Sequence, residues 1–287
     1  MERTTKILAL VGKGGVGKTT ICSAFVRILS EKYPEARILA IDADPAVGLS
    51  TALGVTPGVT LDDLRRAIIE KAASGAGKEA IELLGEVRFR IFDALTETER
   101  FAFLAIGRPE GAGCYCAVNA YLKEVIEMIS RDFDFVVIDG EAGIEQVNRR
   151  VMEKVTHLFF VTDGSKKGVQ VVNSIHHVAD ELVAYDKCGV IVNRVDDPEV
   201  IRALTGGNPA EDPVPGKNPA GEASEPGKDP AENTVPGKDL AGMEILGVIP
   251  SDPEHAKNDI LGKSIFELSA DAPVCKGAKE ALERMGL

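Results

Sequence analysis

The chain has 287 residues, of which 44% are hydrophobic and 5% aromatic, and it contains no tryptophan. This content is high enough for a sizeable core, which must be aliphatic, and it excludes a disordered chain. The formal net charge is −12 at pH 7 and the sequence pI is about 5.0. Such an acidic chain is not expected to bind nucleic acid or anionic membranes through its overall charge, although this argument does not extend to a local basic site.

The first apolar run, residues 7–11, is too short for a signal peptide or a membrane span, and no stretch of about 18 apolar residues follows. Five cysteines, an odd number, favour a reducing compartment over a disulfide framework. We therefore expect a soluble, cytoplasmic protein with no nucleic-acid or membrane partner.

Continuous apolar runs alternate along the chain with segments whose apolar residues have helical spacing. The predicted strands are residues 7–11, 37–41, 87–92, 101–106, 133–138, 157–161, 189–192 and 244–249, and the clearest helices are residues 19–31, 61–71 and 118–129. Runs that are apolar throughout indicate strands buried on both faces. The predicted fold class is α/β, with a doubly wound, mainly parallel β-sheet flanked by helices.

A glycine-rich motif lies between the first predicted strand and the first predicted helix. Residues 12–19, GKGGVGKT, match the G-x-x-x-x-G-K-[ST] phosphate loop. In such a loop Lys18 would reach the β- and γ-phosphates of a nucleotide, and Thr19 would bind Mg²⁺. The predicted nucleotide-binding residues are Gly12, Lys13, Gly14, Gly15, Val16, Gly17, Lys18, Thr19 and Thr20, and Lys18 is also a predicted catalytic residue.

The additional lysine of the motif, Lys13, makes it similar to the deviant Walker A motif, K-G-G-x-G-K-[ST]. The chain thus resembles the P-loop NTPase family that includes MinD, ParA, the arsenite-pump ATPases and the nitrogenase iron protein. The resemblance implies one doubly wound domain that hydrolyses ATP to ADP and phosphate as a nucleotide-bridged homodimer. It also implies that Lys13 is catalytic and stabilises charge on the partner subunit's nucleotide.

Two acidic motifs follow predicted strands, at the sheet edge where α/β proteins bind ligands. Asp42 and Asp44 belong to the sequence DADP, and Asp139 begins the sequence DGEAG. The resemblance gives Asp44 the catalytic role of orienting the attacking water and gives Asp139 the role of holding Mg²⁺ through water. Asp42 is expected to support the ion or its waters. An isolated aspartate at a strand end would otherwise be a helix cap or a turn residue.

The base pocket is inferred from the resemblance alone. Asn193 and Arg194 follow a predicted strand, as in relatives in which an asparagine contacts adenine. Pro250 and Asp252 belong to a second stretch that resembles one beside the base. These residues imply ATP as the nucleotide, whereas their alternative role is to form turns.

Two cysteines, Cys114 and Cys116, stand one residue apart in a glycine-flanked loop before a predicted helix. A disulfide between them would be strained. Two thiolates are too few to close a metal site, but a two-fold dimer would supply four. Four thiolates favour Zn²⁺ or an iron–sulfur cluster. The other cysteines, Cys22, Cys188 and Cys275, are expected to be structural.

A more specific resemblance covers most of the chain. The phosphate loop, the DADP motif, residues 105–119 around the two cysteines and residues 139–145 together resemble the CooC and AcsF ATPases. These proteins assist nickel insertion into carbon monoxide dehydrogenase and acetyl-CoA synthase. The resemblance implies an ATP- and Mg²⁺-dependent metallochaperone that binds Ni²⁺ or Zn²⁺ between two subunits through Cys114 and Cys116, with carbon monoxide dehydrogenase/acetyl-CoA synthase as the client.

Two alternative functions use the same phosphate loop. An electron-transfer ATPase like the nitrogenase iron protein holds an iron–sulfur cluster with cysteines from separate loops, whereas the two cysteines here share one loop. A MinD- or ParA-like positioning ATPase needs an amphipathic C-terminal helix or a basic surface. The C-terminal segment, residues 276–287, is short, and its charges are spread around the predicted helix instead of lying on one face.

Residues 206–240 interrupt the alternation of strands and helices. They contain seven of the fifteen prolines and an imperfect repeat whose units start ten or eleven residues apart. They carry almost no large apolar side chain, which stacked repeat units would require. We expect a flexible Pro/Gly-rich insertion within a single nucleotide-binding domain that spans residues 1–287.

Overall fold

A computed structural model of the chain describes residues 4–44, 48–73, 91–92, 94–107, 116–140, 154–205, 240 and 242–287. The strands are β1 (Lys6–Gly12), β2 (Ile38–Asp42), β3 (Thr96–Glu97), β4 (Ala102–Ala105), β5 (Phe135–Asp139), β6 (His157–Thr162), β7 (Lys187–Asn193) and β8 (Ile245–Ile249). The helices are α1 (Lys18–Lys32), α2 (Gly48–Leu53), α3 (Leu61–Ala73), α5 (Cys116–Ser130), α7 (Lys166–Leu182), α8 (Pro198–Thr205), α9 (Pro253–Ile260) and α10 (Pro273–Arg284), with a 3₁₀ turn at Ile265–Glu267.

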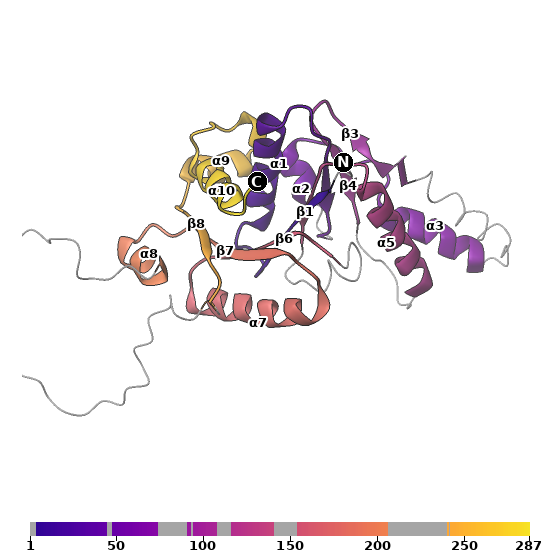
Figure 1. Ribbon diagram of the computed structural model, residues 1–287. Coiled ribbons are helices and arrows are strands. Elements are labelled where there is room, and N and C mark those ends of the chain that lie inside the picture. The colour runs from indigo at the N-terminus through magenta and orange to yellow at the C-terminus, as the bar shows by residue number, and fades with distance from the viewer. Residues whose placement is uncertain are drawn as a thin grey trace, which may run out of the picture.

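The described strands form one sheet in the order β3-β4-β2-β5-β1-β6-β7-β8 (Figure 1). All neighbouring strands are parallel except β3 and β4. Helices cover both faces of this sheet, so the predicted doubly wound, mainly parallel α/β fold is confirmed.

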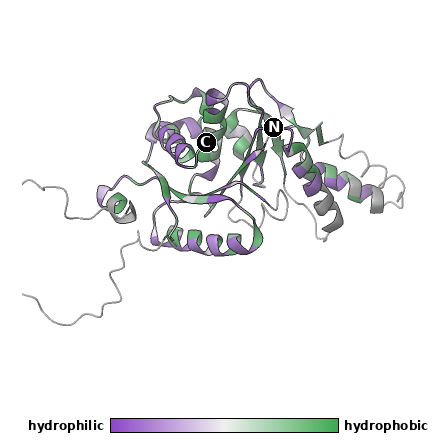
Figure 2. Cartoon of the chain, in the orientation of Figure 1, coloured by the Kyte–Doolittle hydropathy of each residue, from purple (hydrophilic) through white to green (hydrophobic). Residues whose placement is uncertain are grey.

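The two faces of the sheet are buried in two separate cores, because successive strand side chains point in opposite directions. In β1, Leu8 and Leu10 pack with α1, α2 and α10, whereas Ala9 and Val11 pack with α3, α5, α7 and α8. The central strands are accordingly mostly hydrophobic, while α7 is hydrophobic toward the sheet and hydrophilic outward (Figure 2). This double burial explains why the central strands are continuous apolar runs.

The strand predicted at residues 87–92 is wrong at residues 91 and 92, which the structure describes. Of residues 87–92, only Ile91 and Phe92 are described, and they are helical. The alternation of apolar and charged residues favoured a strand, but Ile91, Ala94 and Leu95 have the spacing of one helix face, and they pack into the core. The short antiparallel edge strand β3 was not predicted, because its two residues carry no detectable pattern.

The proposed insertion, residues 206–240, lies outside the described residues except for its last residue. Leu240 has an exposed fraction of 2% and belongs to the core on the α7 face of the sheet. The cysteines predicted to be structural are buried at Cys22 and Cys275 and partly buried at Cys188.

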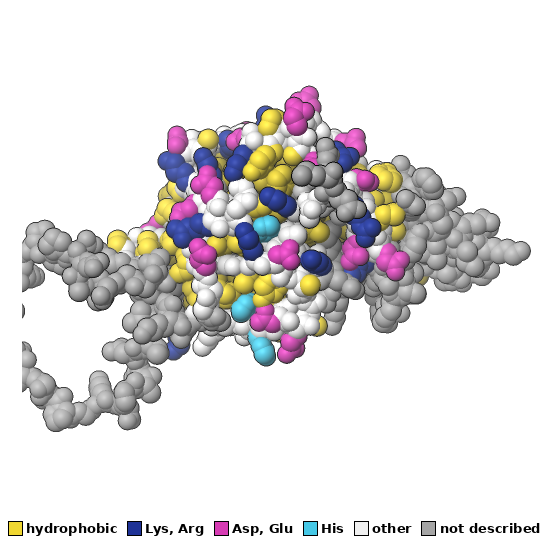
Figure 3. All heavy atoms as spheres, viewed as in Figure 1, with side chains coloured by type: hydrophobic (Ala, Val, Ile, Leu, Met, Phe, Trp, Pro, Cys, Tyr) yellow, Lys and Arg dark blue, Asp and Glu magenta, His cyan; other side chains and the backbone are white. Residues whose placement is uncertain are grey.

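The described surface mixes charges of both signs. Figure 3 shows lysine and arginine side chains interspersed with aspartate and glutamate on one face. Within the described part of the chain, no helix is both long enough and apolar enough to cross a membrane.

Candidate nucleotide site

The carboxyl ends of the parallel strands bring the predicted site residues to one edge of the sheet. The phosphate loop connects β1 to α1, while Asp42 and Asp139 are the last residues of β2 and β5. Asn193 is the last residue of β7, and Pro250 follows β8 directly. Residues that are far apart in sequence thus meet where open α/β sheets bind their ligands.

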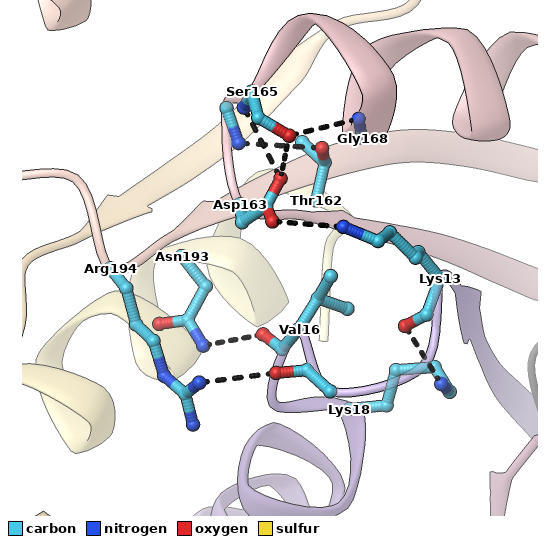
Figure 4. A network of polar contacts seen from close by, with 11 residues as sticks. Lys13, Val16, Lys18, Thr162, Asp163, Ser165, Gly168, Asn193 and Arg194 are labelled. Atoms are coloured by element: carbon cyan, nitrogen blue, oxygen red, sulfur yellow. Dashed lines mark hydrogen bonds and ion pairs between the residues drawn. The ribbon is translucent and has the colours of Figure 1, made fainter.

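The phosphate loop has a backbone conformation that depends on its glycines. Gly15 and Gly17 have φ angles of +82° and +94°, in the left-handed region that favours glycine. The Lys18 side chain is buried and its ammonium donates a hydrogen bond of 3.2 Å to the Gly12 carbonyl. It donates a second, of 3.3 Å, to the Lys13 carbonyl (Figure 4). The loop therefore curls around its own lysine, with its backbone at the N-terminus of α1, where an anion is favoured.

Two residues at the end of β7 brace this loop from the side. The Asn193 amide donates a hydrogen bond of 2.8 Å to the Val16 carbonyl, and the Arg194 guanidinium donates one of 3.1 Å to Gly15 (Figure 4). A Cβ atom on Gly17 would collide with the Asn193 amide, so the glycine allows this close approach. The sequence predicts that Asn193 and Arg194 lie beside the base; in the structure both are hydrogen-bonded to the phosphate loop.

Lys13 has a partner that the sequence analysis missed. Its ammonium lies 3.5 Å from the carboxylate of Asp163, which directly follows β6 at the same sheet edge (Figure 4). Burial alone would raise the pKa of Asp163, but hydrogen bonds from Ser165 and the charge of Lys13 hold it below its ordinary value. The position of Asp163 after a strand was the only sequence signal for it.

Asp139 is a buried carboxylate at the end of β5. Its exposed fraction is 1%, and neither carboxylate oxygen accepts a hydrogen bond of normal geometry from any residue that the structure describes. Burial raises the pKa of Asp139 to about 7; the nearby Thr19 hydroxyl opposes this rise, and the charge of Asp42 adds to it. Such an isolated acid is costly in an apolar interior, and its place beside Thr19 of the phosphate loop fits a hydrated divalent cation.

Asp42 lies beside Asp139 in the sheet but is bonded differently. Its two oxygens accept backbone hydrogen bonds from Asp44, at 3.1 Å, and from Leu49, at 2.9 Å. Burial raises the pKa of Asp42 to about 6 against the lowering effect of these hydrogen bonds. These two bonds attach the backbone at Asp44 and at Leu49 of α2 to the end of β2. A turn residue is the alternative role that the sequence leaves open for Asp42.

The predicted base residues line one pocket. A cavity of about 390 Å³ is bordered by Asn193, Arg194, Pro250 and Asp252, together with residues that the sequence analysis did not select: Ser251, His255 and Ile260 among them. Asp252 also caps α9, because its carboxylate accepts hydrogen bonds from the backbone N–H groups of Glu254 and His255. Thr20 of α1 borders the cavity at the phosphate loop.

The cysteine pair cannot be placed in the same way. Cys114 lies outside the described residues, and Cys116 is described only as the first residue of the α5 backbone. Among the residues whose positions are described, no three His, Cys, Asp or Glu side chains are grouped so that they could hold a metal ion. A cysteine site shared between two subunits therefore stays a prediction.

Comparison with known protein families agrees with this geometry. Residues 7–215 match the model of the family described as "CobQ/CobB/MinD/ParA nucleotide binding domain". The chain belongs to this family. An uncharacterized ATP-binding protein of Methanocaldococcus jannaschii is 33% identical over 97% of this chain and 98% of its own length. The CobQ/CobB/MinD/ParA match includes the phosphate loop, Asp42, Asp139 and Asn193.

Two further similarities are more distant. The carbon monoxide dehydrogenase accessory protein CooC of Rhodospirillum rubrum is 28% identical over 69% of this chain and 82% of its own length. The solved structure of the septum site-determining protein MinD of Pyrococcus horikoshii, complexed with Mg-ADP, has a TM-score of 0.63 and 21% identity, covering 98% of this chain and 96% of that one. The MinD similarity shows the fold alone.

Proposed function

We propose that this protein is an ATP-hydrolysing metallochaperone that dimerises on nucleotide binding and assists nickel insertion into carbon monoxide dehydrogenase/acetyl-CoA synthase. The observation that carries the ATPase part is a folded phosphate loop beside the buried carboxylate of Asp139, at the carboxyl edge of the sheet, whose oxygens accept no hydrogen bond of normal geometry from the residues that the structure describes. The metal part is supported by the pair Cys114 and Cys116 in the sequence, together with the similarity to CooC.

The site residues have different roles toward the nucleotide. Lys18 and the backbone N–H groups bind the phosphates, and Lys13 leaves Asp163 to stabilise negative charge on the nucleotide of a second subunit. Thr19 and Asp139 would hold Mg²⁺, which neutralises charge that develops on the phosphates. Asp44 orients the attacking water.

The base would occupy the cavity beyond Thr20. Its borders include Asn193 and Arg194 at the end of β7, and Pro250 and Asp252 after β8. The ATP-binding relative from Methanocaldococcus jannaschii supports ATP as the nucleotide.

The metal ion would be the cargo. Cys114 and Cys116 of two subunits supply four thiolates, and the N-terminus of α5, which begins at Cys116, favours their ionised form. ATP binding would change the distance between the two pairs by closing the dimer, so metal affinity and nucleotide state are coupled.

Single-cysteine substitutions test this function. We expect Cys114→Ser and Cys116→Ser to abolish stoichiometric nickel binding by the purified protein while ATP binding stays unchanged. Cys188→Ser, which changes a cysteine outside the pair, is the matched control and should bind nickel normally. Nickel binding that survives in both variants contradicts the metal site, and a brown protein with acid-labile sulfide after anaerobic purification favours the iron–sulfur alternative.

A further inference from the structure

Helix α9 forms one wall of the nucleotide cavity without belonging to the core. None of its residues, Pro253–Ile260, is buried. It is fixed at its first turn by the Asp252 cap, and its side chains His255 and Ile260 border the cavity. Since a helix normally buries one apolar face, the unburied inner face of α9 is what a bound nucleotide would cover.

His255 is the residue of α9 that approaches the phosphate loop. Its ring atom Nε2 lies 3.4 Å from the hydroxyl oxygen of Thr20, at the start of α1. The Asp252 carboxylate accepts hydrogen bonds from the backbone N–H groups of Glu254 and His255. The imidazole is therefore directed across the cavity toward α1.

The position of Thr20 indicates which part of a nucleotide would meet this imidazole. In a phosphate loop the lysine reaches the β- and γ-phosphates and the following hydroxyl binds the Mg²⁺ between them. Thr20 comes one residue after Thr19 and borders the base cavity, so it lies at the junction between the phosphates and the base. The α-phosphate occupies that junction in any nucleotide whose base enters the cavity.

We propose that His255 is a nucleotide-binding residue whose ring N–H donates a hydrogen bond to the α-phosphate. This inference rests on the proposed function, because it requires a nucleotide in the cavity. It assigns α9 the task of joining the phosphate end of the site to its base end. An imidazole N–H is a suitable donor for a phosphate oxygen, and hydrogen bonds to charged acceptors are stronger than those to neutral ones.

Calorimetric titration with Mg-ADP tests the inference in three variants. His255→Ala should weaken ADP binding about tenfold, the loss expected for one hydrogen bond to a charged group. His255→Gln keeps an N–H donor and should recover part of that loss. Lys257→Ala, on the same helix but not among the residues that border the cavity, is the matched control and should bind like the parent.

Phosphorus NMR of bound ADP separates a direct contact from a disturbed fold. The α-phosphorus resonance should move in His255→Ala while the β-phosphorus resonance stays in place. A variant that binds ADP as tightly as the parent overturns the inference, and so does a variant in which both resonances move equally. A parent protein that binds no ADP would overturn the proposed function as well, so the two failures are distinguishable.

Discussion

Two neighbouring aspartates, Asp42 and Asp139, show how equal burial can accompany different roles. They end adjacent strands and face each other in the sheet register, with exposed fractions of 0% and 1%. The oxygens of Asp42 are hydrogen-bonded to backbone N–H groups, whereas those of Asp139 have no such partner among the described residues. A satisfied carboxylate holds the chain in place, but an unsatisfied one costs stability unless a ligand compensates it. From this difference we propose a structural role for Asp42 and a ligand-dependent role for Asp139.

The largest expected effect is on activity at Asp139. We expect Asp139→Asn to lower ATP hydrolysis by about 100-fold or more, because a neutral amide cannot hold a hydrated Mg²⁺ as a carboxylate does. The measurement is phosphate release at saturating ATP and Mg²⁺. Asp271→Asn, an exposed aspartate, is the control and should hydrolyse ATP like the parent. Hydrolysis by Asp139→Asn near the parent rate would remove Asp139 from the metal site.

The second effect is on stability at Asp42. Asp42→Asn replaces one of two accepting oxygens with a donor that faces a backbone N–H, so we expect the free energy of unfolding to fall by about 2 kcal/mol. Denaturant unfolding measures this change. Asp139→Asn loses no such hydrogen bond and serves as the comparison. If Asp139→Asn is the more destabilised of the two, the division of roles is wrong.

The third effect concerns pH. Burial raises the pKa of Asp139 to about 7 and that of Asp42 to about 6, from the ordinary value of 3.8 for an aspartate. Between about pH 4 and pH 7 the folded protein therefore holds protons that the unfolded chain has released. The contribution of these two groups to the free energy of unfolding falls as the pH rises through this range. In a sample without nucleotide and Mg²⁺, unfolding should become easier as the pH rises from about 4 to about 7. Asp139→Asn should flatten the upper part of this profile, and an unchanged slope would contradict the assigned pKa.

The smallest effect is expected at Asp163, a third carboxylate on the same edge. Its ion pair with Lys13 leaves both side chains about one third exposed, so water screens the attraction. Asp163→Asn should change the free energy of unfolding by less than about 1 kcal/mol. Denaturant unfolding with Asp271→Asn as the control checks this value. A loss as large as that of Asp42→Asn would show that the Lys13–Asp163 pair is part of the fold.

The sequence was sufficient for elements whose cause is local. Strands such as β1 and β5 are apolar throughout because both faces are buried, and the phosphate loop has a fixed glycine and lysine spacing. The positions of Asp42 and Asp139 followed from the strands that precede them. Their bonding followed only in part: the bond from the Asp44 N–H to Asp42 spans two residues, as in a turn, but the bond from the Leu49 N–H in α2 spans seven residues and has no sequence signal.

Contacts between distant segments account for what the sequence missed. Asn193 was predicted to lie beside the base, but its bond to Val16 spans 177 residues and has no sequence signal. Asp163 and His255 were not predicted for the same reason. Asp163 contacts Lys13 of the phosphate loop and His255 contacts Thr20 of α1, and both partners are distant in the sequence. The helix at Ile91 required knowledge of which residues face the core.

The most direct test of the proposed metallochaperone function is whether nucleotide binding changes the affinity for nickel. Nickel affinity of the parent protein should be measured by competition with a chelator, once with Mg-ADP and once with a non-hydrolysable ATP analogue. We expect the two dissociation constants for nickel to differ by about fivefold or more, because the nucleotide state would set the geometry around the cysteine pairs. Equal affinities in the two states would contradict the proposed function.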